Sequence, residues 1–470
     1  MEKKTVLSNF EIMSFALPNA VSAMVHLIPV MYGMMFMTEY LGISAAAMAT
    51  AMLVTKLMDY GVAIFAGSII EKTHSKKHGK YALWLRITTF TLFFGSLLQL
   101  LNTNSIIPSS IGRLIFVSIF YCTLHFGMNF RATSQGGLLQ RMAGTSMETR
   151  KILNARNGQF SAMITIIFGA ITIPLIEFFG GNFGEANGYA LTIVVYGALF
   201  MALSFFMLFP VMKKYDIPRE KAEIKNVPPV RDMFKSIITN NQMIVMFFMI
   251  TSMTVGTQIY TPLVAYYFNV VTGRFAVMTL LLTVQGISAF LFSLVAPAIA
   301  RKLGKKGTLM FSSGLSLLCY VGIWLLGLNN LWALVVFASL IKGAEAIYRC
   351  FAINYFLDCG EYGYYTTGQD NRTMALTVMN WPIKIGFMAG GTAVGYGLAL
   401  IGYEAGMVVT DAFSRSFMML FGLVPAALLA ITFLLAMFAY KLTDEQSAFY
   451  AAENNKREAA MREAALNAAK

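Results

Sequence analysis

The feature that most constrains this chain is a succession of apolar runs, each about 20 residues or longer, that continues almost from end to end. A helix of that length spans the hydrocarbon core of a bilayer. The composition agrees, because 57% of the 470 residues are hydrophobic and only 13% are charged. A soluble domain would carry about twice that charged fraction. We therefore predict an integral membrane protein that is embedded in the lipid bilayer.

Twelve such runs can be delimited along the chain. We expect an all-α polytopic membrane protein with twelve transmembrane helices. The expected helices lie at 10–38, 44–70, 81–101, 112–141, 153–180, 188–212, 242–269, 274–300, 307–328, 331–358, 375–403 and 413–440.

Lysine and arginine are concentrated in alternate loops between these runs. Loop 71–80 carries four lysines, loop 301–306 carries four basic residues, and the stretch 213–235 carries seven. Cytoplasmic loops are the ones enriched in basic residues, so we predict a multi-pass protein of the cell inner (plasma) membrane with both termini in the cytoplasm. The net charge of +13 is then explained by topology and contact with anionic lipid, and we expect no nucleic-acid partner.

The chain also carries a weak internal repeat. A basic loop that contains glycine follows the second helix of each half, EKTHSKKHGK at 71–80 and RKLGKKG at 301–307. Duplicated halves of this kind are typical of secondary transporters. We expect an N-terminal six-helix bundle, a cytoplasmic linker, a C-terminal six-helix bundle and a cytoplasmic tail, at 1–212, 213–241, 242–441 and 442–470.

No catalytic motif is present in the sequence. It contains no Walker loop, GxSxG or HExxH, and its four histidines are scattered. We therefore predict neither an enzyme nor a bound cofactor or metal. The absence of a nucleotide-binding loop also argues against a primary pump, which leaves a secondary transporter or facilitator of a small molecule, acting as a monomer.

Several ionisable residues fall inside the apolar runs, where a charge is costly unless it is paired or hydrated. Asp59, Arg131 and Lys384 lie on different helices at comparable depth, which favours a watery central cavity. Ser134 and Gln135 share a helix face with Arg131. A further set, Lys342, Glu345 and Arg349, is spaced to pair along one helix, and the sequence leaves open whether it is a structural network or a functional one.

Two stretches resemble the glycoside–pentoside–hexuronide:cation symporter (melibiose-permease-like) family of the major facilitator superfamily. The first is TKLMDYGVAIFAGSIIEKTHSKKHGKYALW at 55–84, and the second is FLDCGEY at 356–362 followed by NWPIKIG at 380–386. The similarity extends over roughly 10–441. It implies the major facilitator fold and alternating-access transport by two six-helix bundles around a central site.

The resemblance also implies a cation site, from which this sequence departs. Asp59 keeps the first carboxylate of helix two. Where the family has its second carboxylate and a neighbouring Asn, this chain has Ala63 and Val62. Where the family has a Thr on helix four, this chain has Arg131. We hypothesise that Arg131 replaces the cation and pairs with Asp59 in a degraded coupling site. Sodium coupling would then be lost, which leaves coupling to protons or none.

The positions of the family's two sugar-binding aspartates correspond to the neighbourhood of Ala23 and to Ser134 in this chain. The position of the family's helix-four Trp is occupied by Leu138. With fewer carboxylates and an added arginine, the site favours a small organic solute that is sugar-like and anionic. The resemblance keeps Lys384 and places a helix-five Arg close to Arg156. The predicted substrate-binding residues are Ser134, Gln135, Arg156, Trp381 and Lys384.

The other matches, Lys80, Asp358 and Glu361, are expected at the cytoplasmic surface. They would either gate transport through ion pairs between the halves or cap loops, with Arg141, Arg150, Arg301 and Arg372 as candidate partners. Two other function classes stay open. One is a transporter of lipids or amphipathic carboxylates, and the other is a membrane sensor or scaffold that does not transport.

Overall fold

The computed structural model describes residues 7–73, 75, 77–144, 146–217, 238–368 and 378–468. Within these ranges every regular element is a helix, as the sequence predicts. The chain divides into two compact units, and each is described by itself. The first comprises Met1–Asn226, Thr261–Gly286 and Gly391–Ser414, and the second comprises Val227–Tyr260, Ile287–Gly390 and Arg415–Lys470.

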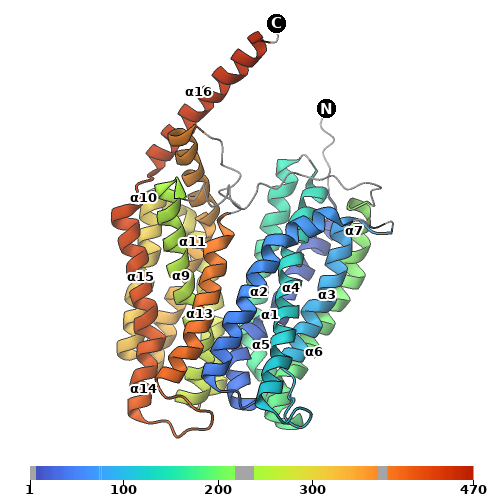
Figure 1. Cartoon of the computed structure of the whole chain (residues 1–470), viewed down its shortest axis with the longest axis vertical. Helices are drawn as coiled ribbons and strands as arrows, with labels where there is room; N and C mark the ends of the chain where they lie inside the picture. The colour runs from blue at the N-terminus through green and yellow to red at the C-terminus, as the bar shows by residue number, and fades with distance from the viewer. Residues whose placement is uncertain are drawn as a thin grey trace. The chain divides into compact units, whose positions relative to one another are not determined.

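The first half of the chain forms long helices (Figure 1), and side-chain caps fix the starts of four of them. Ser8, Ser44, Ser109 and Ser146 each accept a backbone N–H from the first turn of α1, α2, α4 and α5. The elements are α1 (Asn9–Met35), η1 (Phe36–Tyr40), α2 (Ala45–Lys72), α3 (Lys80–Gln99), α4 (Ser110–Ala143), α5 (Met147–Phe183), α6 (Glu185–Leu203), η2 (Ser204–Leu208) and α7 (Phe209–Tyr215).

The second half repeats this plan. Its elements are α9 (Asn241–Tyr266), η3 (Tyr267–Val271), η4 (Phe275–Val277), α10 (Met278–Leu326), α11 (Leu331–Thr367), α13 (Asn380–Leu400), α14 (Asp411–Met418), η5 (Met419–Leu423), α15 (Val424–Leu434), η6 (Leu435–Ala439) and the tail helix α16 (Asp444–Ala468). In the described chain ten helices are long and apolar enough to cross a membrane, or eleven when the bent α2 is counted. Because α10 holds two predicted spans on either side of Gly304, where φ is +68°, the described helices account for all twelve.

Helices α3 and α4 pack closely because small residues line their contact. A Cβ atom on Gly95 would lie 2.7 Å from the backbone nitrogen of Leu124, and one on Gly127 would lie 2.4 Å from Oγ1 of Thr91. Small residues allow helix backbones to approach within a bilayer. This contact fixes the rotation of α4, which carries most of the polar residues described below.

An aspartate that follows the sixth span of the first half caps the third helix of that half. Asp216 Oδ2 accepts the N–H of Ala82 in the first turn of α3 at 2.7 Å. Gly79 makes room for this carboxylate, since a Cβ there would lie 2.2 Å from the Asp216 carboxyl carbon. The chain that leaves the bundle is thereby fastened to the loop between α2 and α3.

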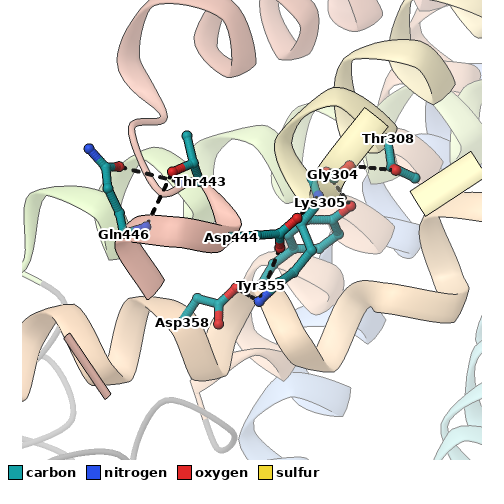
Figure 2. A network of polar contacts seen from close by, with 8 residues as sticks. All are labelled: Gly304, Lys305, Thr308, Tyr355, Asp358, Thr443, Asp444 and Gln446. Carbon is teal, nitrogen blue, oxygen red and sulfur yellow. Dashed lines mark hydrogen bonds and ion pairs between the residues drawn. The ribbon is translucent and has the colours of Figure 1, made fainter. Parts of the chain in front are cut away.

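The second half uses the same arrangement at the matching place (Figure 2). Asp444, at the start of α16, accepts the N–H of Lys305 through Oδ2 at 3.1 Å, directly after the break at Gly304. Lys305 Nζ also lies 2.5 Å from Asp358 Oδ2, and Tyr355 donates to the Lys305 carbonyl at 3.1 Å. The weak repeat between the basic loops therefore corresponds to a shared way of capping the third helix in each half.

Removal of either cap should destabilise the protein moderately. We expect D216A and D444A each to lower the free energy of unfolding by about 1 kcal/mol, which is the usual value of a helix N-cap. Thermal unfolding in detergent measures the effect, with Glu404→Ala in an exposed loop as the control. Melting temperatures equal to that of the control would show that these carboxylates do not stabilise the helix starts.

Candidate substrate and coupling site

Helix α4 carries polar side chains on two different faces inside the apolar region. Asn129 and Arg131 are two residues apart, which separates them by about 200° around the helix. Asn129 contacts α2, whereas Arg131 contacts α1, α3 and α6. The two faces are therefore separate candidate sites.

Arg131 lies inside the first unit with only 3% of its surface exposed. Its guanidinium donates to Oγ1 of Thr89 and to Oδ1 of Asn19, both at 3.4 Å, and lies 4.7 Å from the ring centre of Phe200. Gln135 donates to the same Asn19 oxygen. Among the described residues, Nε of Arg131 has no hydrogen-bond partner, and the guanidinium contacts neutral side chains only.

Asp59 lies against the opposite face of α4. Its Oδ1 accepts the side-chain N–H of Asn129 at 2.5 Å. The hypothesis that Arg131 replaces the cation beside Asp59 is therefore wrong for this structure. The physical reason is the offset of two residues between Asn129 and Arg131, which turns the guanidinium away from α2.

A second pair between α2 and α4 was missed by the sequence reasoning. Lys56 Nζ lies 2.9 Å from His125 Nε2, and both residues are buried. The His125 ring stacks on Tyr121 with 4.0 Å between ring centres, and Lys56 Nζ lies 4.9 Å from the centre of the same tyrosine ring. The sequence feature that could have indicated this pair is Lys56 itself, because it is a lysine within an apolar run, three residues before Asp59.

The other predicted substrate residues are spread over both units. Ser134 is fully buried, and its Oγ has no partner among the described residues. Arg156 on α5 is exposed and donates to Gln159 on its own helix at 3.0 Å. In the second unit, Trp381 is buried and Lys384 is half-buried on α13. The structure joins Arg131 and Gln135 through Asn19, and a role for any of these residues in substrate binding stays a prediction.

The three predicted gating residues make contacts within their own half of the chain or with its tail. Asp358 pairs with Lys305 (Figure 2), and Asn454 of α16 donates to Glu361 at 2.7 Å. Lys80 pairs with Glu71 across the loop between α2 and α3. These contacts fit the loop-capping alternative. Arg372, one of the suggested partners, lies outside the described residues.

The charged set on α11 pairs internally, as its spacing allowed. Lys342 Nζ lies 3.0 Å from Glu345 Oε2, and Arg349 Nε donates to Glu345 Oε1 at 3.0 Å. The glutamate side chain is 11% exposed, whereas that of Arg349 is 70% exposed. The arrangement is therefore a local ion-pair network centred on one buried carboxylate.

A hydroxyl cluster joins η1, which continues directly from α1, to segments of the second half, all within the first unit. Tyr266 OH lies 2.9 Å from Thr38 Oγ1, and Tyr403 donates to Thr38 at 3.2 Å and to Glu39. Nearby, Gly395 of α13 lies so close to α2 that a Cβ atom would meet Ala49 Cβ at 2.6 Å. This end of the first unit is thus closed by tight contacts.

Comparison with known proteins gives these features a context. The sequence model of the family described as MFS/sugar transport protein matches residues 14–444. The chain is 26% identical to the uncharacterized symporter YjmB of Bacillus subtilis over 89% of each chain. It is 21% identical to the glucuronide carrier protein homolog of Escherichia coli over 87% of this chain and 88% of that one.

A likeness to solved structures supports the fold alone. The crystal structure of the nucleoside transporter NupG matches with a TM-score of 0.62 at 13% identity, over 92% of this chain and 100% of that one. The membrane-length helices, the charges buried among them and a family match over nearly the whole length lead to one conclusion. The chain belongs to the MFS/sugar transport protein family, and it is a secondary transporter of a small solute rather than an enzyme.

Proposed function

We propose that the transported solute is an anionic, sugar-like molecule such as a uronate, and that Arg131 binds its carboxylate. The observation that carries this proposal is that Arg131 is only 3% exposed, has neutral partners in the described chain, and has no partner there for its Nε. A buried cation is strongly destabilised without a counter-charge. The planar guanidinium matches a carboxylate through two parallel hydrogen bonds, so an anionic solute would supply the missing partner.

The neighbours of Arg131 support a sugar-like solute. Asn19 and Gln135 carry amide groups and are only partly buried, so they are the first side chains of this cluster that a solute would meet. Ser134 adds a buried hydroxyl without a partner among the described residues. Amides and hydroxyls can pair with sugar hydroxyls, and the name of the glucuronide carrier protein homolog also indicates an anionic sugar.

The proposal includes an orientation and a driving force. The basic loops support an orientation with both termini in the cytoplasm, in which the hydroxyl cluster around Thr38 and Tyr403 lies at the outer surface. Related symporters imply a co-transported cation. Because the sodium ligands of the family pattern fall on Ala63 and Val62, we propose that the cation is a proton and that the protein acts as a monomer.

A binding assay on purified protein tests the proposal. Glucuronate should raise the melting temperature in sodium and in potassium alike, whereas glucose, which lacks the carboxylate, should not. Arg131→Gln should weaken glucuronate binding roughly a hundredfold, equivalent to about 3 kcal/mol for a desolvated charge pair.

Arg86→Gln is the matched control. Its guanidinium also lies over a phenylalanine ring, 4.9 Å from the centre of Phe209, and its Nε has no partner in the described part of the chain. It should bind glucuronate like the wild type. Equal stabilisation by glucose and glucuronate, or unchanged binding by Arg131→Gln, would refute the proposal.

A further inference from the structure

We infer that His125 is the proton-binding residue of this transporter and that Lys56 changes its partner when the proton arrives. This inference rests on the proposed proton coupling and names the residues that perform it. It starts from an unusual contact, a lysine ammonium 2.9 Å from an imidazole nitrogen, with both residues buried. The chain around the pair fixes which nitrogen of the ring can take up a proton.

The hydrogen bonds define the tautomer of His125. Its Nδ1 lies 3.0 Å from the carbonyl oxygen of Tyr121, an acceptor only, so Nδ1 carries the hydrogen. The other nitrogen, Nε2, therefore keeps its lone pair and accepts from the Lys56 ammonium. The neutral imidazole thus accepts a hydrogen bond from the buried Lys56 ammonium. Nε2 is the ring nitrogen to which a proton would bind.

Protonation of His125 makes this contact repulsive. The imidazole Nε2 gains a proton and becomes a donor, no covalent bond breaks, and two donors that each belong to a cation then face each other. The Lys56 ammonium must leave Nε2. Asp59 lies three residues further along the same face of α2 and attracts it, so proton binding moves the ammonium toward the Asp59–Asn129 pair.

The surroundings favour this exchange. The ionisable groups near the pair include Asp59 on α2 and Tyr121 and Cys122 on α4. The adjoining stretch of α3, residues 91–95, has no ionisable side chain. Both Lys56 and Asp59 lie well inside the membrane, because Lys56 is about 16 Å along α2 from its first residue.

A row of polar groups leads from the pair to an exposed residue. His125, Asn129 and Thr133 lie one helical turn apart on one face of α4. Thr133 is exposed, and Asp59, which accepts from Asn129, is half-buried, so we infer that the proton reaches the pair along this face. Because the same exchange changes how α2 bonds to α4, it links protonation to the packing of two spanning helices.

Transport in proteoliposomes separates coupling from solute binding. Counterflow of radiolabelled glucuronate needs solute binding but no proton gradient, whereas accumulation against a concentration difference needs both. In H125Q the accumulation driven by a pH gradient should fall at least about tenfold, and counterflow should fall much less. K56M should show the same split, because no ammonium remains to move.

His26→Gln is the matched control. The Nδ1 of His26 also lies 3.0 Å from the carbonyl oxygen four residues earlier, in Ser22, and its ratio of driven accumulation to counterflow should equal that of the wild type. An H125Q protein with an unchanged ratio would overturn the inference. Wild-type protein without counterflow would refute the proposed solute instead.

Nuclear magnetic resonance of protein labelled with ¹⁵N-histidine tests the pair without any solute. The four histidines give few signals, and H125Q identifies the one from His125. At high pH the Nε2 of His125 should report a lone pair, and on acidification it should gain a proton in the wild type. A hydrogen on Nε2 at high pH, or no protonation on acidification, would overturn the inference even if counterflow is absent.

Discussion

Glu345→Gln should destabilise the protein by about 1–3 kcal/mol, because it removes the counter-charge of Lys342, whose side chain is only 25% exposed. The glutamate side chain, 11% exposed, is the common acceptor for Lys342 and Arg349 on α11. Glutamine keeps the shape of the side chain but removes the charge that offsets both cations. Loss of the folded fraction after heating, measured by size-exclusion chromatography, should reveal the effect as a drop in melting temperature.

The tail helix offers a control of the same spacing in water. Glu453 and Lys456 also pair three residues apart, at 2.6 Å, with side chains 36% and 73% exposed. Since exposed pairs contribute at most about 1 kcal/mol, Glu453→Gln should leave the melting temperature nearly unchanged. If both glutamine variants melt at the same temperature, the α11 network is not a buried one.

Gly95→Val should be the most damaging substitution at the contact between α3 and α4. Its new carbon atoms would meet the backbone of Leu124, where a Cβ alone would lie 2.7 Å from the nitrogen. A backbone cannot rotate away as a side chain can, so the helices must separate. We expect a loss of about 3 kcal/mol or more, at the upper end for overpacking, and a low yield of monodisperse protein.

Gly136→Val separates this steric effect from the change in helix propensity. Gly136 also lies within a spanning helix, α4, but a Cβ there would have nothing within 4 Å. Because valine is a better helix former than glycine, this variant should be as stable as the wild type. Equal losses from both substitutions would show that the close approach at Gly95 is not the cause.

Features that depend on local spacing were predicted well from the sequence. The apolar runs predicted the helices correctly, because a helix that spans a bilayer needs about 20 apolar residues. This requirement does not depend on which other helices it packs against. The network of Lys342, Glu345 and Arg349 follows from separations of three and four residues on one helix. The contact between the tail and α11, where Asn454 donates to Glu361, was not predicted.

The candidate site could not be predicted in the same way, because it depends on how helices are rotated against each other. Asp59 and Arg131 lie at similar depth, but depth does not determine direction. The packing of α3 against α4 at Gly95 and Gly127 directs Arg131 away from α2 and Asn129 toward it. His125 was not predicted as a functional residue, because the four histidines are too scattered in the sequence to bind a metal together. A search for metal ligands does not detect a histidine whose partner is a lysine.

The break in α10 has a consequence for biosynthesis. Two spans are joined there through Gly304 with no loop between them. Their shared tip carries Arg301, Lys302, Lys305 and Lys306, and moving four cations through hydrocarbon would be very costly. Because of this cost, the pair does not insert by passing its tip across the bilayer. The tip should therefore stay on the side of the membrane where the ribosome delivers it, which orients the later spans of the chain.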